Sequence, residues 1–471
     1  MKKHQNTCGR HDELAPLLPS RVIDVGKATS NKVFLYESPA GQRGTYMCLS
    51  YCWGRSNFIK STGATVQRHM TRGIALRDLP RVFQDAIGIV RAFQVRYLWI
   101  DSLCIIQDCK EDCDKESARM AEVYSNSFLT IAATRAANPD ESLFSTRGGC
   151  TTASVRVQHF RHFPNTQSAK NTQNFPLLSR GWTYQERILP PRVLHFGPDE
   201  VLWDCRGDRQ CECGEASHYL DEVEKANFFR CTTTSPSTDL EAQRRQKVWR
   251  LVVVQYTALD LTHPSDIFPA LSGLAEAMRA STGEDYLAGL WSGSLSADLL
   301  WYQNKRGSYP GAAGRDWRAP SWSWASIDGS VMYHHSLYTK QSGSLDFIQH
   351  CQVINAECIP AGESQTGRIT SGHIKLRCQV VKAVVKGRRV MPESCYTMPH
   401  LFPHFDRDFK SFHNDDVYDV YLCRIAKVSH IDYSILLEVD NLEDQMFRRI
   451  GLVEHYGEQT WPQETRVITI V

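Results

Sequence analysis

The chain has 471 residues, of which 42% are hydrophobic and 23% charged, so it carries enough apolar material for a folded core. Its 54 Lys and Arg residues nearly balance 52 Asp and Glu residues, for a net charge of +2. This balance disfavours a protein that binds nucleic acid through a basic excess. No apolar run reaches about 18 residues, so we expect no membrane span.

The N-terminal stretch MKKHQNTCGRHDELAPLLPS contains two lysines but no apolar stretch behind them, which predicts that the chain has no secretory signal. The chain contains 16 cysteines. In a long chain with a good core and no secretory signal, we expect these residues to be free thiols in a reducing compartment. The sequence therefore predicts a cytoplasmic protein.

After a polar lead-in over residues 1–44, strand patterns alternate with helix patterns. Asp78-Leu79-Pro80 predicts a helix start, with a capping residue and a proline in the first turn. The expected order is a strand at 45–51, a helix from Asp78 to Phe93, a strand at 97–101, a helix with Tyr124 on its apolar face and a strand at 128–134. Such alternation is typical of a parallel α/β sheet, whose ligands bind at the carboxyl ends of the strands.

The rest of the chain divides into three kinds of segment. Residues 182–188 predict a short helix that Pro190 and Pro191 stop, and strands are expected at 192–196 and 200–205. Residues 135–176 resemble a loop, residues 206–240 a linker, and residues 241–305 are expected to be helical. Alternating patterns predict many strands within residues 330–471.

A family resemblance lies in the blocks YMCLSYCWG, LPRVFQDAIGIVRAFQVRYLWIDSLCIIQD, EVYSNSFLTIAA and SRGWTYQERILPPRVLHFG, which in this order resemble the fungal heterokaryon-incompatibility (HET) domain. The blocks WRLVVVQYTALDLTHPSDIFPALSGLA, YLAGLW and APSWSWASIDG resemble the extension that follows this domain in many members. The resemblance covers about residues 46–330. Cys48 departs from it, because the family usually carries a small residue such as Ala there, and a strand should tolerate that change.

The resemblance implies a role in fungal self/non-self recognition, in which HET domains trigger cell death after incompatible strains fuse. The family is also similar to TIR domains, which are flavodoxin-like modules, and some of them hydrolyse NAD. We therefore expect an α/β fold with a flavodoxin/TIR-like parallel sheet, a helical extension and a β-rich C-terminal region. The expected domains are the lead-in at 1–44, a HET (TIR-like) domain at 45–205, a linker and helical extension at 206–330 and the β-rich region at 331–471.

Trp182 and Glu186 are four residues apart, so on a helix they share one face. Catalytic TIR domains resemble this, with a Trp and a Glu at the same spacing beside their nucleotide cleft. The resemblance thus implies that Glu186 is the catalytic carboxylate and that Trp182 binds substrate. A carboxylate suits cleavage of an N-glycosidic bond because it stabilises oxocarbenium character. The alternative is a structural helix, with Trp182 in the core and Glu186 paired to Arg180 or Arg187.

The segment from Leu49 to Gly54 resembles the first strand and the following loop of TIR domains. Ser50 could contact a ribose or phosphate, Tyr51 or Trp53 could stack on a base, and Gly54 would let the backbone approach closely. The alternative is a strand end packed by its own aromatic residues, with Ser50 capping the chain. The segment lacks the spacing of a phosphate-cradling glycine loop.

Asp101 and Ser102 follow the expected strand at 97–101, at the ligand edge of the sheet. They are candidate binding residues for the same substrate. The alternative is a helix cap, which is the commoner role of Asp and Ser where a strand passes into a helix.

No metal site is predicted. Cys205, Cys211 and Cys213 lie near His218, but their spacing does not give the paired ligands that zinc needs. A hydrolase triad of Ser50, Asp101 and His195 is also disfavoured, because the chain lacks the strained turn that carries a nucleophilic serine.

The resemblance and these residues together predict a HET-domain effector of heterokaryon incompatibility and cell death. NAD hydrolysis is the expected mechanism if the protein is an enzyme, with NAD as substrate and no firmly implied cofactor. One alternative is a non-enzymatic signalling module that acts by assembly, and another is a scaffold recruited to small-molecule metabolism. The expected partners are other incompatibility proteins or further copies of the chain, without nucleic acid and without a membrane span.

Overall fold

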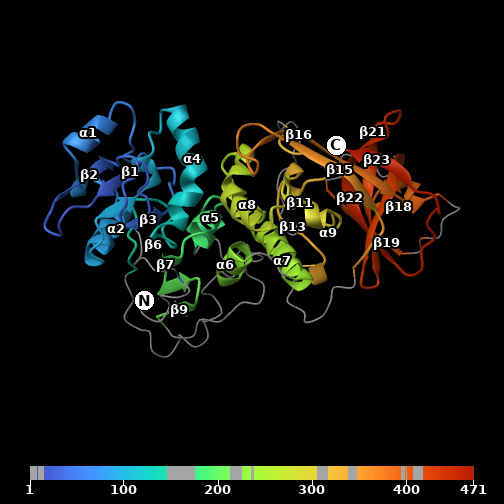
Figure 1. Ribbon diagram of the computed structural model, residues 1–471, viewed down its shortest axis with the longest axis horizontal. Coiled ribbons are helices and arrows are strands. Elements are labelled where there is room, and N and C mark those ends of the chain that lie inside the picture. The colour runs from blue at the N-terminus through green and yellow to red at the C-terminus, as the bar shows by residue number, and fades with distance from the viewer. Residues whose placement is uncertain are drawn as a thin grey trace. The chain divides into compact units, whose positions relative to one another are not determined.

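The computed structural model describes residue 8 and residues 15–145, 175–212, 225–234, 238–304, 317–337, 347–393, 398, 400–406 and 417–471. It divides into two compact units, Met1–Arg230 (unit 1) and Cys231–Val471 (unit 2) (Figure 1). Each unit is described by itself below.

Unit 1 is built around a mixed sheet, in which nine strands of the described chain lie in the order β4-β2-β1-β5-β3-β6-β7-β8-β9. The strands are β1 (Arg21–Asp24), β2 (Lys32–Glu37), β3 (Tyr46–Ser50), β4 (Ile74–Ala75), β5 (Tyr97–Trp99), β6 (Leu129–Ala132), β7 (Arg192–Phe196), β8 (Val201–Cys205) and β9 (Arg209–Cys211). The expected strands at 45–51, 97–101, 128–134, 192–196 and 200–205 therefore all form; the bounds agree at 192–196 and are slightly shorter for the other four.

Only the centre of this sheet is parallel. β3 runs parallel to β5 on one side and to β6 on the other, and β6 runs parallel to β7. β1, β2, β4, β8 and β9 pair antiparallel with their neighbours. The expectation of a parallel sheet thus holds for four strands and is wrong for the flanks. The polar lead-in supplies two of these flanking strands, because Val22, Val33 and Leu35 are buried.

The helices of unit 1 connect the strands of the sheet. They are α1 (Val66–Thr71), α2 (Arg81–Ala92), α3 (Asp101–Cys104), α4 (Lys110–Ser125) and α5 (Thr183–Ile188), and α6 (Lys225–Thr233) spans the division between the units. The predicted cap of α2 is wrong. Pro80 occupies the N-cap position without a side-chain bond, and Asp78 instead ends a short 3-10 helix. Pro80 has a φ of −54°, which the first turn of a helix tolerates, and Asp78 lies too early in the chain to occupy the N-cap position.

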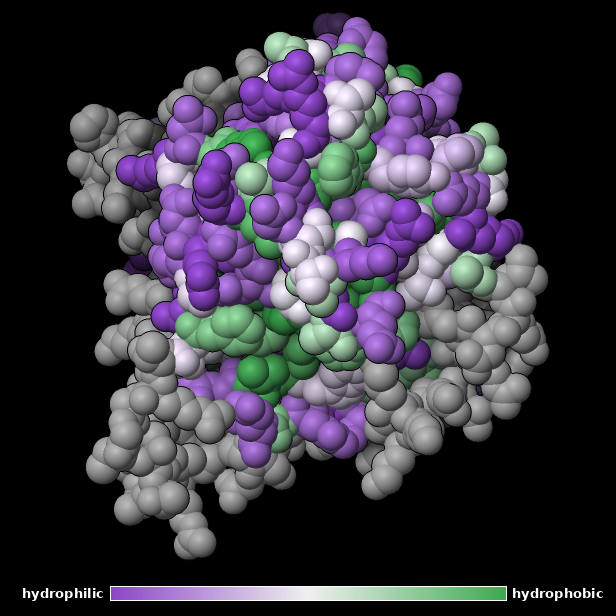
Figure 2. All heavy atoms as spheres, turned by 90° about the vertical axis from the view of Figure 1, so that its left-hand side faces the viewer, coloured by the Kyte–Doolittle hydropathy of each residue, from purple (hydrophilic) through white to green (hydrophobic). Residues whose placement is uncertain are grey.

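The core of unit 1 gathers apolar side chains from both the strands and the helices, among them Leu49 of β3, Phe83 of α2, Trp99 of β5 and Ile131 of β6. Figure 2 shows the side of the molecule that lies at the left of Figure 1, where polar side chains cover most of the surface and apolar ones emerge in small groups. Scattered apolar side chains of this kind are common on protein surfaces.

Unit 2 contains a larger sheet, which ten strands of its described residues form. Eight of them follow the order β15-β16-β23-β22-β21-β20-β17-β18, while β14 pairs with β20 and β19 with β22. The strands are β14 (Phe347–Gln349), β15 (Gln352–Pro360), β16 (Ile369–Cys378), β17 (Val380–Lys386), β18 (Arg389–Pro392), β19 (His400–Phe405), β20 (Val417–Val428), β21 (Ile431–Asn441), β22 (Met446–Tyr456) and β23 (Arg466–Ile470). The prediction of a β-rich C-terminal region is confirmed.

The first part of unit 2 is mainly helical, with α7 (Asp239–Tyr256), α8 (Pro269–Thr282) and α9 (Leu295–Asp298). Two short strand pairs accompany them, β10 (Tyr286–Leu287) with β11 (Leu290–Trp291) and β12 (Tyr302–Gln303) with β13 (Val331–Met332). Thr238 caps α7 by accepting a hydrogen bond from the Glu241 backbone, and Gly283 ends α8 in the left-handed conformation. Within the residues that the structure describes, no helix combines the length and the apolar character needed to cross a membrane.

Candidate functional site

The central contact of the site joins Ser50 to Glu186. The Ser50 hydroxyl, on the last residue of β3, donates a hydrogen bond of 2.5 Å to Oε2 of Glu186 on α5. Both side chains are buried, with 4% and 7% of their surface exposed. The contact brings together two residues that the sequence analysis named separately as candidate site residues.

Local geometry sets the orientation of α5. The Thr183 hydroxyl donates to the carbonyl oxygens of Leu177 and Arg180, at 2.8 Å each, and so ties the first turn of the helix to the preceding 3-10 helix. Pro190 and Pro191 follow the last turn and prevent the helix from continuing. The six-residue helix therefore presents Glu186 from a short segment that is held at both ends.

The carboxyl group of Glu186 has an unusual proton affinity. Burial raises its pKa from the usual 4.5 to about 7, and the hydrogen bond from Ser50 opposes that rise. The negative charge of Asp101 adds to the increase, whereas Arg180 and the hydroxyl of Tyr124 reduce it. Because the pKa lies close to neutral pH, the group can exist in both protonation states under physiological conditions.

The loop after β3 is joined to the segment after β5 by two hydrogen bonds. The Tyr51 hydroxyl donates to Oγ of Ser102 at 2.8 Å, and the indole nitrogen of Trp53 donates to Oδ2 of Asp101 at 2.8 Å. The structure thus brings together four residues that the sequence placed at one edge of the sheet. Burial raises the pKa of Asp101, while the bonds from Trp53 and the Ser102 backbone oppose this.

Asp101 also stabilises α3, the helix that begins with this residue. Its Oδ1 accepts a 2.6 Å hydrogen bond from the backbone of Ser102, and it is the first residue of α3, whose N-cap position is Ile100. The side chain therefore stabilises the start of α3 while its second oxygen holds Trp53. The binding role and the structural role that the sequence left open are compatible in this geometry.

Gly54 and Trp182 complete the predicted set. Gly54 has a φ of +63°, and a Cβ there would lie 2.7 Å from Cβ of Asn138, so the loop has no room for a side chain. Gly54 therefore allows the loop after β3 to pack closely against the segment that contains Asn138. Trp182 occupies the N-cap position of α5 and is partly buried against the core of unit 1.

Comparison with known families identifies the region that holds this site. Residues 46–186 match the family model described as Heterokaryon incompatibility protein (HET). This segment of the chain is therefore similar to a HET domain. The match begins at the first residue of β3 and ends at Glu186, so it contains every predicted site residue. A comparison with curated proteins found no match, and a comparison with solved structures found none either.

Arg180 is a residue of the HET domain that the sequence analysis treated only as an ion-pair partner. Its positive charge lowers the pKa of Glu186, of Asp101 and of Cys52. In the described chain it forms no ion pair with Glu186. Arg187, the other expected partner, lies over the ring of Tyr184 at 5.3 Å.

Lys225 is a second residue that the analysis missed. It is almost fully buried, and its Nζ donates to the carbonyl oxygens of Pro190 at 2.9 Å, of Ile188 at 3.5 Å and of Arg187. These carbonyls end α5, where a cation is favourable. Burial lowers the Lys225 pKa to about 7. A lysine in a polar segment is expected at the protein surface, so nothing in the sequence indicated this buried contact.

The disfavoured triad does not form. His195 lies on β7, and its Nδ1 is 3.0 Å from the hydroxyl of Thr134, while Ser50 and Asp101 have the partners described above. Cys213 and His218 lie outside the described residues. Among the residues that are described, no group of three or more His, Cys, Asp or Glu side chains is arranged to hold a metal ion.

An open hollow lies beside the loop after β3. Its walls come from residues 57–59, from the turn at 78–80 and from Asp140. Phe58 is one of these residues, and its ring makes edge contacts with Trp53 at 5.7 Å and with Tyr51 at 6.2 Å. Ser50 and Glu186 do not line the hollow. The hollow is therefore lined by Phe58, which packs against the aromatic residues of the loop, and not by the buried carboxyl group.

Proposed function

We propose that this protein is an effector of heterokaryon incompatibility whose HET domain hydrolyses NAD and thereby kills the cell. Glu186 is the catalytic carboxylate in this proposal. Ser50, Tyr51, Trp53, Gly54, Asp101, Ser102 and Trp182 form the surrounding binding region. The observation that carries the proposal is the buried carboxyl group of Glu186, held by Ser50 at the carboxyl end of a parallel strand.

The strand order supports a nucleotide site at this position. The parallel strands lie in the order β5-β3-β6-β7, so the chain moves from β3 to one side and then crosses to the other. In open α/β sheets, ligands bind where this reversal occurs, at the carboxyl ends of the two strands that flank it. Here those strands are β3 and β6, and Ser50 lies directly opposite Ala132. This order is also the basis for proposing a flavodoxin/TIR-like domain.

The chemistry follows from the charge of Glu186. As the bond between nicotinamide and ribose breaks, the ribose gains positive charge, which a nearby carboxylate stabilises. Nicotinamide leaves with the electron pair of the bond, water adds to the ribose, and the products are nicotinamide, ADP-ribose and a proton. Ser50 orients the carboxylate, and the pKa near 7 means that a large fraction is ionised at neutral pH.

The burial of Ser50 and Glu186 favours one alternative, a non-enzymatic module that acts by assembly. Ser50 and Glu186 are only 4% and 7% exposed, and their shared hydrogen bond satisfies both groups without a ligand. A purely structural pair would have the same features. In that case partners, either other incompatibility proteins or further copies of the chain, bind elsewhere on the surface.

The full-length protein should be incubated with NAD while nicotinamide release is followed by chromatography. Glu186→Gln keeps the side-chain volume, so the proposal expects a folded variant that releases nicotinamide at least 10²-fold more slowly, since one stabilising charge is worth about 3–4 kcal/mol. Glu116→Gln is the matched control, because Glu116 is a buried carboxylate on α4 of the same unit. Expression of both variants in a fungal host then links activity to killing.

The three outcomes are distinct. Loss of both nicotinamide release and killing in a folded Glu186→Gln variant supports the enzyme. Killing at wild-type level in that variant, with the protein folded, eliminates NAD hydrolysis as the mechanism and supports assembly. A lower melting temperature and a low yield of Glu186→Gln indicate a structural role for the carboxyl group.

A further inference from the structure

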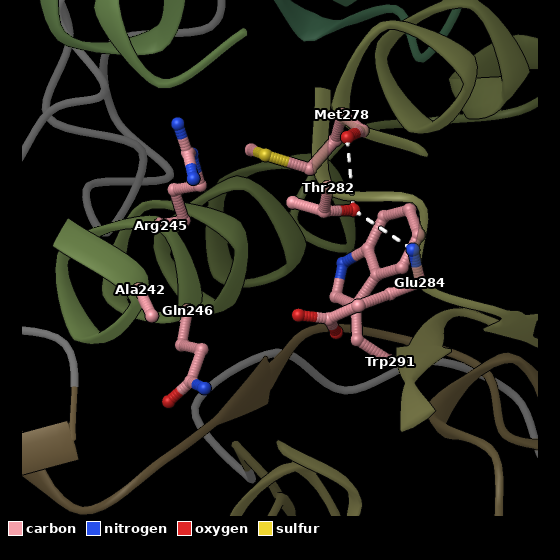
Figure 3. A pocket seen from close by; sticks show the side chains of 7 residues that line it. All are labelled: Ala242, Arg245, Gln246, Met278, Thr282, Glu284 and Trp291. Atoms are coloured by element: carbon pink, nitrogen blue, oxygen red, sulfur yellow. Dashed lines mark hydrogen bonds between the residues drawn. The ribbon is translucent and has the colours of Figure 1, made fainter. Parts of the chain in front are cut away.

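The small pocket of unit 2 that Figure 3 shows is too small for an organic ligand. Its cavity volume is about 20 Å³, which is room for roughly one water molecule. On one wall the Thr282 hydroxyl donates to the carbonyl oxygen of Met278 at 3.2 Å and accepts from the backbone of Glu284 at 3.2 Å (Figure 3). We therefore assign no ligand to this pocket.

Two buried cysteines of the same unit lie in direct contact, and the proposed function does not use them. The Sγ atoms of Cys378 and Cys423 are 3.0 Å apart, which exceeds the S–S bond length of a disulfide by only about 1 Å. Both side chains are fully buried. A small shift of each sulfur is therefore enough to bring the two atoms to bonding distance.

The contact joins two strands that are not neighbours in the sheet. Cys378 is the last residue of β16 and Cys423 lies within β20, and the order β16-β23-β22-β21-β20 places three strands between them. The chain returns to β20 directly after Cys378. The Gln379 carbonyl accepts a 3.0 Å hydrogen bond from the Arg424 backbone, and Val380 of β17 pairs in register with Cys423. A bond between the sulfurs thus connects strands that the hydrogen bonds of the sheet leave unconnected.

The environment of the two sulfurs determines how they react. The hydrogen bond with Cys378, together with burial, raises the pKa of the Cys423 thiol well above its usual value. Because the thiolate is the reactive form of cysteine, Cys423 reacts slowly at neutral pH. Cys351 is a third buried thiol of this unit, and its Sγ lies 3.6 Å from the hydroxyl of Ser296. Cys351 therefore has a polar partner of its own.

We propose that Cys378 and Cys423 form a modification site, at which a peroxide converts the two thiols into a disulfide. One sulfur, as its thiolate, attacks an oxygen of hydrogen peroxide, the O–O bond breaks, and the departing hydroxide takes up the thiol proton and leaves as water. The sulfenic acid that results is attacked by the second sulfur. The S–S bond forms, the S–O bond breaks, and the hydroxyl leaves as a second water with the proton of the second thiol. The sulfurs lose two electrons in total, which reduce the peroxide.

The disulfide cross-links unit 2 across its sheet. The two cysteines are 45 positions apart, so the cross-link closes a long loop and restricts mainly the unfolded chain. Because both sulfurs are buried and Cys423 is a thiol at neutral pH, the reaction proceeds through slow local opening of the sheet. The site therefore responds to sustained exposure to peroxide and not to a brief pulse.

The first experiment identifies the bond in the full-length protein. The protein should be incubated with hydrogen peroxide, its remaining thiols blocked with N-ethylmaleimide in urea, and the digest analysed by mass spectrometry without reduction. The proposal expects two peptides linked through Cys378 and Cys423, lighter by two hydrogen atoms than the separate peptides, which dithiothreitol then separates. Recovery of both cysteines as maleimide adducts overturns the proposal, and so does a link from either of them to Cys351.

Variants then assign the effect on stability. The peroxide-treated wild type should melt at least about 4 °C above its reduced form, because a disulfide of this loop length stabilises the folded state. Cys423→Ala should lose this rise, and alanine leaves no buried hydroxyl without a partner. Cys351→Ala is the matched control and should keep the rise, since Cys351 is a buried thiol of the same unit. An equal rise in folded Cys423→Ala contradicts the proposal, and if that variant does not fold, the linked peptides of the wild type decide.

Discussion

The hydroxyl of Ser50 and the carboxyl group of Glu186 share a 2.5 Å hydrogen bond, although they lie 136 positions apart in the sequence. Ser50 belongs to a central parallel strand and Glu186 to a helix that precedes β7. The bond therefore depends on the complete parallel core of the HET domain. It also gives the domain a buried carboxyl group whose ionisation can be measured, and the next two predictions use this.

The Glu186→Gln variant should gain stability relative to the wild type as the pH rises from 4.5 to 7. Burial raises the pKa of the folded carboxyl group from 4.5 to about 7, so the folded state holds a proton that the unfolded state has lost. The wild type consequently loses stability across this range, by up to about 3 kcal/mol, and a neutral glutamine does not. Melting temperatures of both proteins at several pH values test this. Parallel curves would contradict it.

Ser50→Ala should raise the pKa of Glu186 further, from about 7 to roughly 8, because a hydrogen bond to a carboxylate contributes about 1.5–3 kcal/mol. If the ionised carboxylate performs catalysis, the pH at which NAD cleavage reaches half of its maximum should rise equally. Ser102→Ala is the control, because the Ser102 hydroxyl bonds to Tyr51 and not to Glu186. An unchanged pH profile for Ser50→Ala would show that the bond does not control the charge.

Much of the parallel core could be predicted from the sequence. Strands β3, β5 and β6 are short apolar runs separated by helical patterns, and such local signals need no knowledge of the partner strand. The antiparallel flanks could not be predicted in the same way. Whether β1 pairs with β5 is decided by contacts between residues more than 70 positions apart, such as Ile23 and Leu98, and not by local periodicity.

The candidate site likewise contains some residues that the sequence indicated and others that it did not. Family blocks and strand ends indicated Ser50, Asp101 and Glu186, because functional residues in such sheets gather at the carboxyl ends. Lys225 and Tyr124 gave no such signal. Lys225 is buried against backbone carbonyls, and Tyr124 looked like an ordinary core residue on the apolar face of its helix. Contacts to backbone atoms and between distant helices leave no spacing pattern that a sequence can show.

Trp53→Ala should destabilise the HET domain by about 3 kcal/mol, more than the roughly 1 kcal/mol expected for Cys52→Ala. The alanine loses the bond to Asp101 and the contacts of the indole ring with Phe58 and Lys60, at 5.7 Å and 4.5 Å. Trp53→Phe is informative because it keeps a ring and removes only the hydrogen bond. Thermal unfolding ranks the three variants. Equal stability of Trp53→Ala and Cys52→Ala would contradict the assignment.

Gly54→Ala should destabilise the domain by about 1–2 kcal/mol or more, since its φ of +63° disfavours a side chain and the added Cβ meets Asn138. Gly88→Ala is a control that should change the stability of the domain in the opposite direction. Gly88 lies within α2 with nothing within 4 Å of the added Cβ, so alanine there should stabilise by about 0.5–1 kcal/mol. Denaturation of both variants measures the difference. A harmless Gly54→Ala would show that the loop can move away from Asn138.

Lys225→Met should loosen α5 and with it the position of Glu186. The methionine retains the apolar part of the side chain but removes the donor that three carbonyl oxygens at the end of α5 share. Buried carbonyls without a partner cost about 1–3 kcal/mol each, so the melting temperature should fall and the amides of residues 183–188 should exchange at least tenfold faster. Hydrogen-exchange mass spectrometry measures this directly. Lys110→Met, at an exposed position of α4, should leave exchange in α5 unchanged. Wild-type exchange rates in Lys225→Met would show that the prolines and Thr183 hold α5 without the lysine.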